Sequence, residues 1–376
     1  MSYLVIENVA KAFGKQSVLT DVSLSVERGE TVAVFGPSGA GKTVLLRLLS
    51  GVFAPDVGDV RIGDRSVVDL GPEERGIGMA FQNFALYPHL PAFENIASPL
   101  RARRAPEAEV KERVGRIAEL LRIGHVLHHL PRQLSNGQKQ RTALGRALVR
   151  EPEILLLDDP LRNVDAKLRY EMRLELPRLL KRFGSTVLYV TQDYKEAMAL
   201  GDRVGVLLDG RFRQVDRPAA VYNDPDHVDV ARLFGDPTIN LYPCRPTRGP
   251  RGLSVELFGA TAELPAGPGA AQALDRPCLI GIRPEDVRVD FEEASGGIPV
   301  ELDAVSPLNV RTVLFMRARD RSEIFATCSD REGARFGRGH RDVFARVDLA
   351  KALFFDQANG ERLHFAAAPL AAAAAA

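Results

Sequence analysis

Near the N-terminus, the sequence reads Thr31-Val-Ala-Val-Phe35, followed directly by Gly36-Pro-Ser-Gly-Ala-Gly-Lys42-Thr43. The first segment is a short β-branched strand pattern, and Thr43–Leu49 (TVLLRLL) has the composition of a helix. Glycines between a strand and a helix let the backbone wrap closely around a phosphate chain, whose charge the amide groups and the helix N-terminus stabilise. The pattern GxxxxGK[ST] in this setting predicts a site for a nucleoside triphosphate.

We expect every residue of this phosphate loop to contact ATP. Lys42 can reach the β- and γ-phosphates, and the hydroxyl of Thr43 can ligate Mg²⁺. The alternative is an ordinary glycine turn, which the order of strand, loop and helix disfavours. The predicted ATP-binding residues are Gly36, Pro37, Ser38, Gly39, Ala40, Gly41, Lys42 and Thr43.

The second motif is a pair of acidic residues, Asp158 and Asp159, directly after the apolar strand pattern Ile154–Leu157. A strand that ends in an acidic residue places Asp158 at the carboxyl edge of a parallel sheet, beside the phosphate loop, where a carboxylate can hold Mg²⁺. Strands often end in aspartate, so this signal is specific only in combination with the phosphate loop. Together the two patterns predict an ATP and Mg²⁺ site.

The first part of the chain alternates strand and helix patterns, which predicts an α/β domain with a largely parallel sheet. From about Pro243, short alternating segments separated by Gly- and Pro-rich turns predict a smaller all-β barrel domain. Within it, Arg245–Arg276 is expected to be loop and hairpin and to contribute little core. Further expected strands are Thr186–Val190, Val204–Leu208, Cys278–Ile282 and Val343–Val347, and further expected helices are Glu109–Leu121 and Lys167–Phe183.

The predicted domains are an ATP-binding domain at 1–235, with a helical subdomain at about 83–150, and a β-barrel regulatory domain at 236–366. The alanine-rich tail, 367–376, is left unassigned.

Composition excludes several classes of function. The 376 residues carry 50 Lys+Arg against 49 Asp+Glu, so no basic excess is available to bind nucleic acid by bulk charge. The three cysteines form no CxxC pair, and they are interpreted as small buried hydrophobes. No apolar run approaches the roughly 18–20 residues that cross a bilayer, and the N-terminus lacks the pattern of a secretory signal.

Between the phosphate loop and the acidic strand end, the sequence reads Leu134-Ser135-Asn136-Gly137-Gln138, followed by the helical run KQRTALGRALV. The order of phosphate loop, LSGGQ-like segment and LLLDD strand resembles the nucleotide-binding subunit of an ABC transporter. The resemblance implies that this signature segment begins a helix that caps the γ-phosphate of ATP held by the other subunit of a dimer. By itself, Ser135 is equally well explained as a plain helix N-cap.

The resemblance also implies roles for single residues. Phe13 would stack on adenine, although a core aromatic is the alternative. Gln82 would contact Mg²⁺ and the attacking water, and its loop would lead to the membrane partner. Asn163 and Asp165 would couple the two ATP sites of the dimer.

The C-terminal segments GDPTIN, Gly235–Asn240, and GIRPED, Gly281–Asp286, resemble the OB-like (TOBE) regulatory barrel of the importer branch that includes the maltose-type ATPases. In the loop from Gln82 to Pro99, the aromatics Phe84, Tyr87 and Phe93 are expected to form a groove for a membrane subunit, or else to close the subdomain core.

Three positions depart from the family pattern and indicate a degenerate member. Asp159 stands where the family has a catalytic glutamate, and Gln192 stands where it has a switch histidine. Asn136 replaces a signature glycine. The implied catalytic residues are Asp159, Gln192 and Gln82, and the implied Mg²⁺ ligands are Thr43, Gln82 and Asp158.

The resemblance therefore predicts the ATPase subunit of an importer for a carbohydrate or polyol, with glycerol as the specific guess. Its partners would be two membrane-spanning permease subunits, a second ATPase in a heterodimer and an extracytoplasmic solute-binding protein, at the cytoplasmic face of the membrane. Importers of polyamine, iron or sulfate, a mainly regulatory ATP-binding subunit, and a soluble ATPase acting on ribosomes or DNA are the alternatives.

Overall fold

A computed structural model describes residues 2–250, 252–265, 274–292, 297–308, 310–337 and 341–364. The chain divides into two compact units between Val221 and Tyr222. The domain boundary predicted at 235 and 236 stays a prediction, and the tail 367–376 lies outside the described residues.

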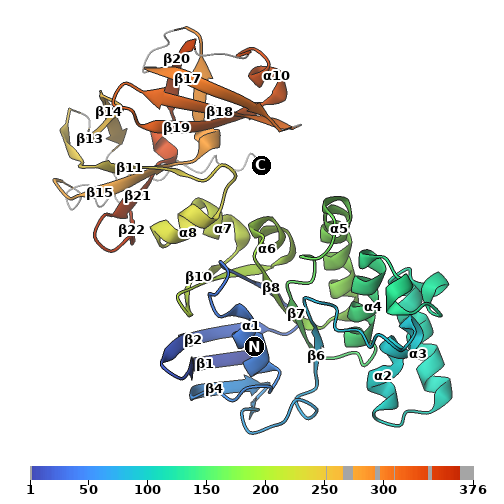
Figure 1. The fold of residues 1–376 in the computed structure, drawn as a ribbon. Coiled ribbons are helices and arrows are strands. Elements are labelled where there is room, and N and C mark those ends of the chain that lie inside the picture. Colours follow the sequence, from blue (N-terminus) through green and yellow to red (C-terminus); the bar gives the residue numbers. More distant parts are fainter. Residues whose placement is uncertain are drawn as a thin grey trace, which may run out of the picture. The chain divides into compact units, whose positions relative to one another are not determined.

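A six-stranded sheet organises the first unit, and its central strands are parallel (Figure 1). In β3, β8 and β7 the side chains are buried throughout, as expected for a sheet covered on both faces. The order is β10 (Arg211–Asp216), β9 (Arg203–Leu208), β3 (Thr31–Phe35), β8 (Thr186–Thr191), β7 (Ile154–Asp158) and β6 (Ile77–Ala80). The predicted α/β class is confirmed.

Successive side chains of these strands point to opposite faces of the sheet, and each face packs into a different hydrophobic core. Ile154 and Leu156 face a core built with helix α1 (Lys42–Leu49) and a second, antiparallel sheet. Leu155 and Leu157 face the opposite core, built with the other helices. The antiparallel sheet, which the sequence analysis did not predict, has the order β2 (Gln16–Glu27), β1 (Ser2–Phe13), β4 (Val57–Ile62) and β5 (Arg65–Ser66).

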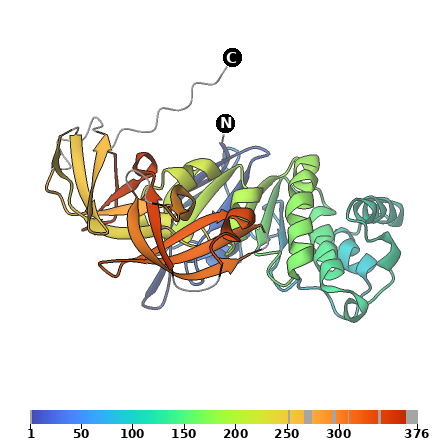
Figure 2. The same cartoon turned by 90° about the horizontal axis from the view of Figure 1, so that it is seen from above.

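The helical part of the first unit lies at the end away from the antiparallel sheet, as the teal and blue ribbons of Figures 1 and 2 show. Its α-helices are α2 (Ala92–Arg101), α3 (Glu107–Leu120), α4 (Asn136–Leu148) and α5 (Ala166–Phe183), with the 3-10 turns η1 (Gly124–Val126) and η2 (Pro131–Gln133). Helix α6 (Tyr194–Leu200) follows β8, and α7 (Pro218–Asn223) spans the division between the units. No helix among the described residues is long and apolar enough to cross a membrane.

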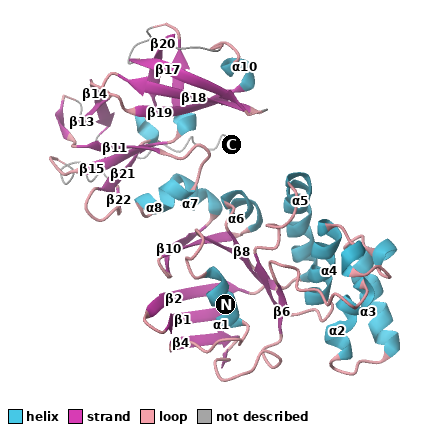
Figure 3. Cartoon of the chain, viewed as in Figure 1, coloured by secondary structure: helices cyan, strands magenta, loops and turns pink. Residues whose placement is uncertain are grey.

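The second unit consists mainly of short antiparallel strands (Figure 3), which form a nearly closed barrel, as predicted. One sheet has the order β11 (Asn240–Cys244), β15 (Cys278–Ile282), β21 (Leu353–Asp356) and β22 (Arg362–Leu363). The largest has the order β16 (Val287–Asp290), β20 (Arg341–Val347), β17 (Ile298–Pro307), β18 (Arg311–Ala318) and β19 (Glu323–Ser329). The short helices are α8 (Val228–Leu233), α10 (Asp330–Gly333), η3 (Pro284–Asp286) and η4 (Leu349–Lys351).

Two expectations for this unit were wrong in part. The segment Arg245–Arg276 forms hairpins, as expected, in a third sheet of β12 (Thr247–Gly249), β13 (Gly252–Leu257) and β14 (Ala260–Pro265), but it also contributes to the core, because Leu253 and Val255 are buried there. The apolar residues of β13 alternate over only a few positions, so this strand was not predicted from the sequence. Most of the glycine-rich stretch PAGPGAAQA lies outside the described residues. Cys244 and Cys328 are only partly buried, and Cys244 lies directly opposite Cys278 across β11 and β15.

Both C-terminal sequence motifs hold the second unit together. Asn240, from GDPTIN, donates from Nδ2 to the carbonyls of Ile282 and Phe325 and accepts from the Phe325 amide. Arg283, from GIRPED, is buried; it donates to the carbonyls of Ala231, Phe234 and Tyr222. The bonds that Arg283 donates are charge-assisted and lie in the interior of the unit.

We expect Arg283→Met to destabilise the second unit by about 3 kcal/mol, because it leaves several buried carbonyls without their donor. Urea unfolding monitored on the full chain measures this, with the exposed Arg319→Met as the control for losing one arginine. Equal midpoints for the two variants would show that the buried guanidinium contributes nothing.

Candidate nucleotide site

The parallel strands bring the predicted site residues to one edge. Phe35 pairs with Thr191, Asp158 with Val190, and Ala80 with Leu157. Since the strands run in the same direction, the residues that follow them lie side by side at the carboxyl edge. The phosphate loop, Gln192, Asp159 and Gln82 therefore all begin from this edge.

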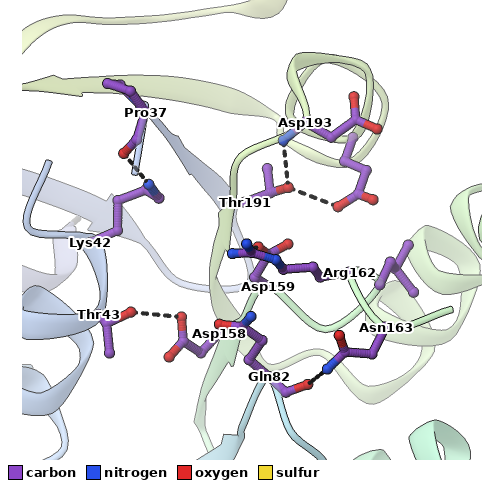
Figure 4. A network of polar contacts seen from close by, with 12 residues as sticks. Pro37, Lys42, Thr43, Gln82, Asp158, Asp159, Arg162, Asn163, Thr191 and Asp193 are labelled. Atoms are coloured by element: carbon purple, nitrogen blue, oxygen red, sulfur yellow. Dashed lines mark hydrogen bonds and ion pairs between the residues drawn. The ribbon is translucent and has the colours of Figure 1, made fainter. Parts of the chain in front are cut away.

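The conformation of the phosphate loop depends on the backbone of Gly41 and on the side chain of Lys42. Gly41 has a φ of 100°, which favours glycine, and a Cβ there would lie 2.6 Å from Leu19 Cδ2. Lys42 is 6% exposed and donates from Nζ to the carbonyls of Gly36 and Pro37, each at 2.7 Å. Figure 4 shows the contact to Pro37. Burial is the main cause that lowers the pKa of Lys42. The loop thus holds a desolvated cation among backbone dipoles.

A pair of adjacent carboxylates lies opposite the lysine. Asp158 accepts from the hydroxyl of Thr43 at 3.3 Å, and burial raises its pKa. Asp159 is 5% exposed, burial raises its pKa too, and its Oδ2 is buried without a hydrogen-bond partner. Two buried acids of this kind favour a nearby cation.

Gln82 and Asn163 are joined at the same edge. Asn163 donates from Nδ2 to the Gln82 carbonyl at 2.8 Å, and the Gln82 side chain extends toward Asp158 in Figure 4. Asp165 is the N-cap of α5, where it accepts from the Leu168 amide at 3.0 Å. Asp165 therefore has a structural task besides the coupling role that the resemblance implied.

Gln192 is exposed directly after β8, and the residues on either side of it belong to a buried polar network that the sequence did not reveal. Glu196, in α6, accepts from the hydroxyls of Tyr189 and Thr191, both at 2.8 Å. Thr191 in turn accepts from the Asp193 amide at 3.0 Å. The network fixes the turn that carries Gln192, and burial raises the pKa of Glu196.

The signature segment lies elsewhere, at the start of α4 among the helices (Figure 1). Ser135 and Gln138 form a capping box: the Gln138 amide donates to the Ser135 hydroxyl oxygen, and the Ser135 amide donates to Gln138 Oε1. A Cβ on Gly137 would lie 2.2 Å from Leu168, and Asn136 is exposed. Leu134 is buried and anchors the segment.

Phe13 is 43% exposed at the end of β1, with its ring 5.3 Å from that of Phe53. It is available for stacking and is not a closed core aromatic. Of the three aromatics after Gln82, Tyr87 is exposed, as a groove for a partner requires, and Phe84 is half-buried. Phe93 packs against the helical core, which is the alternative expected for these residues.

Sequence reasoning also missed two arginines at the loop after β7: Arg162 within the loop and Arg169 in the first turns of α5. Arg169 donates to the carbonyls of Leu161, Arg162 and Val164 and so fixes this loop. Arg162 lies beside Asp159, with one guanidinium nitrogen 3.7 Å from Oδ2. The only signal in the sequence is that Arg162 lies three residues after Asp159.

A desolvated lysine in a glycine loop, paired acids and a Thr hydroxyl at the edge of a parallel sheet define a P-loop nucleotide-binding protein of the ATPase type. Residues 19–162 match the family model described as ABC transporter. The dimeric ATP-binding cassette MJ0796, solved in a post-hydrolysis state with ADP and Pi, matches 57% of this chain and 98% of its own with a TM-score of 0.52 and 32% identity.

Two curated relatives match over most of their length. The osmoprotective compounds uptake ATP-binding protein GgtA of Synechocystis sp. is 42% identical over 361 residues, which is 95% of this chain and 98% of the relative. The sn-glycerol-3-phosphate import ATP-binding protein UgpC of Escherichia coli K12 is 42% identical over 309 residues, 82% of this chain and 86% of the relative. The chain belongs to the family of ABC transporter ATP-binding proteins and is an ATPase.

Replacing Glu196 by Gln keeps an acceptor oxygen for both hydroxyls but removes the buried charge. Because burial raises the pKa of Glu196 above its unfolded value, the carboxyl is best accommodated when protonated, and that contribution to stability is lost as the pH rises through the raised pKa. We expect Glu196→Gln to gain unfolding free energy relative to wild type as the pH rises from acid to neutral. Thermal unfolding across pH measures this, and Glu196→Ala should be less stable than both at every pH.

Proposed function

We propose that this chain is the ATP-hydrolysing subunit of an importer for a polyol or a related carbohydrate. The observation that carries the proposal is the match to GgtA over nearly the whole chain, the barrel included. The two relatives are named for osmoprotective compounds and for sn-glycerol-3-phosphate. These names favour glycerol or another small polyol, free or phosphorylated, over the alternatives of polyamine, iron and sulfate.

In the proposed site, ATP lies along the carboxyl edge of the sheet. Phe13 stacks on adenine, and residues Gly36–Thr43 surround the phosphates with their amides. Lys42 exchanges its bonds to the Gly36 and Pro37 carbonyls for the β- and γ-phosphates, whose charge is the stronger partner. The short reach from Nζ to these carbonyls already places the ammonium inside the loop.

The residues present fit Mg²⁺. Thr43 Oγ1 and Asp158 Oδ1 are hard oxygen donors 3.3 Å apart, and the buried carboxyl of Asp158 favours a cation. Mg²⁺ is usually held by one or two carboxylates together with phosphate oxygens, so two protein oxygens and the nearby Gln82 suffice. Bound there, the ion would neutralise charge on the β- and γ-phosphates.

Hydrolysis needs a group that orients water. Asp159 is the proposed base, and Gln192 the residue that contacts the γ-phosphate. The carboxyl of Asp159 is one methylene shorter than that of a glutamate, and a misplacement of about 1 Å can cost about 100-fold in rate. Gln192 carries no positive charge. We therefore propose that this chain's own site turns over slowly.

The exposed groove beneath the Gln82 loop is the proposed seat of a permease subunit. It has a volume of about 710 Å³, and its lining includes Tyr87, Pro99, Phe81 and Arg146. Arg146 donates to the carbonyls of Phe84 and Ala85 and lies over the ring of Tyr87, which shapes this wall. An apolar helix with a polar end fits such a groove.

The exposed start of α4 is the proposed contribution to a second site. A helix N-terminus with an exposed Ser135 and Asn136 offers amides and dipole to an anion, but it lies among the helices, away from this chain's own phosphate loop. We propose a head-to-tail dimer in which Leu134–Gln138 covers ATP bound by a second, different ATPase. Asn163 and Asp165 lie in the loop that would connect the two sites.

The assembly would include two permease subunits and an extracytoplasmic solute-binding protein, with this chain peripheral on the cytoplasmic face of the membrane. No role with nucleic acid is proposed, because the charge is balanced. A mainly regulatory subunit with little hydrolysis is the second candidate, since Asp159 and Gln192 both weaken the chain's own site.

Lys42→Ala should lose most ATP affinity, because the phosphate charge loses its nearest cation. Phe13→Ala should lose less, since one aromatic–base stack is worth about 1–3 kcal/mol. Equilibrium titration of the full chain with ATP measures both, and Lys139→Ala, a cation of α4, is the control. Tight ATP binding retained by Lys42→Ala would contradict the proposed phosphate site.

The heterodimer is tested by turnover of the purified complex. Changing the second ATPase's catalytic glutamate should abolish hydrolysis, whereas Asp159→Asn in this chain should reduce it only slightly. A complex that contains two copies of this chain, no second ATPase, and hydrolyses ATP briskly would refute the heterodimer. It would leave the importer ATPase itself intact.

A further inference from the structure

A second cation lies in the nucleotide site besides Lys42. The guanidinium of Arg162 is 3.7 Å from Asp159 Oδ2, close enough for an ion pair but too far for a hydrogen bond. Figure 4 shows the side chain reaching back from the loop over Asp159, toward the phosphate-loop side of the site. The Asp159 oxygen is buried and accepts no hydrogen bond, so this pairing is loose.

Arg162 is also within electrostatic range of the phosphate loop. After burial and the opposing effects of Asp159 and Asp158, its charge contributes to the lowered pKa of Lys42. On Asp159, burial raises the pKa and Arg162 is the main opposing influence. The guanidinium therefore lies beside the proposed base, on the side of the site where Figure 4 draws Lys42 and the phosphate loop.

The backbone of Arg162 is fixed while its side chain is half in solvent. Arg169 holds the carbonyls of residues 161, 162 and 164, and Asn163 is tied to the Gln82 carbonyl. The Arg162 side chain is 48% exposed. A long side chain on a fixed base can exchange one anionic partner for another without moving the loop.

We propose that Arg162 is a γ-phosphate ligand of this chain's own site: it leaves Asp159 for the terminal phosphate when a nucleoside triphosphate binds. This inference rests on the proposed ATP site and goes beyond it. A guanidinium binds phosphate oxygens through paired, charge-assisted hydrogen bonds, which a single long contact to one carboxylate oxygen does not match. The exchange supplies the positive charge that Gln192 lacks, and it frees the Asp159 carboxylate only when the triphosphate is present.

The test compares ATP with ADP on the full-length chain in the presence of Mg²⁺. Arg162→Gln should weaken ATP binding about tenfold or more, the usual loss for a hydrogen bond to a charged group, and leave ADP binding unchanged. Arg162→Lys should recover part of the ATP affinity, because it restores the charge but not the paired geometry. Arg178→Gln, which removes an exposed arginine of α5, is the matched control and should change neither.

A cycle with Asp159→Asn separates the phosphate contact from simple neutralisation of Asp159. If Arg162 binds phosphate, Arg162→Gln weakens ATP binding in the Asp159→Asn background as well. If it only neutralises Asp159, the effect disappears there, and the inference is overturned while the ATP site stands. An equal loss of ATP and ADP affinity would also overturn it. A wild-type chain that binds neither nucleotide would instead overturn the proposed function, and this inference with it.

Discussion

Parallel alignment of β3, β8, β7 and β6 is the constraint on which the site depends. The pairing of Phe35 with Thr191 and of Asp158 with Val190 sets where each following residue begins. A shift of one residue in either pairing would turn the strand's side chains to the opposite face and break both cores at once. Packing in the two cores therefore fixes the register of the strands, and the register places the lysine, the acids and Gln192 at one edge.

Burial of charge is the second feature of this edge. Lys42, Asp158 and Asp159 are each at most 6% exposed, and burial shifts the pKa of all three toward the neutral form. Charges in such surroundings are stabilised by counter-charges and hydrogen bonds more than charges at a surface are. A magnesium nucleotide contains both a cation and a polyanion. The cation would stabilise the two carboxylates, and the phosphates would stabilise the ammonium of Lys42. Arg162 and Arg169 show that the loop after β7 belongs to the same electrostatic unit.

Much of the fold and part of the site could be predicted from the sequence because local patterns report local structure. The expected strands Thr31–Phe35 and Ile154–Leu157 and the helix Lys167–Phe183 lie within or at β3, β7 and α5. The phosphate loop and Asp158 were found because glycine spacing and a strand end are short-range signals. The C-terminal barrel was predicted from turn spacing, whereas β13 was missed because its pattern is short.

What the sequence did not reveal depends on contacts between distant residues. Nothing along the chain indicates that Glu196 accepts from Tyr189, that Arg169 ties the loop at Leu161, or that Cys244 faces Cys278. The sequence could not decide between the two alternatives for Phe93 for the same reason, since the helical core against which it packs is assembled from several helices. Asp159 and Gln192 were interpreted as departures from the pattern of the family that the sequence resembles, and this interpretation stays a prediction; their surroundings came only from the structure.

Amide hydrogen exchange with and without Mg²⁺-ATP measures nucleotide binding at each loop of the site in one experiment. We expect slower exchange at residues 38–43 and at residues 158–163 on adding millimolar ATP, with β17–β19 of the barrel unchanged. Exchange at residues 38–43 that is the same with and without ATP would contradict a nucleotide site at this edge of the sheet.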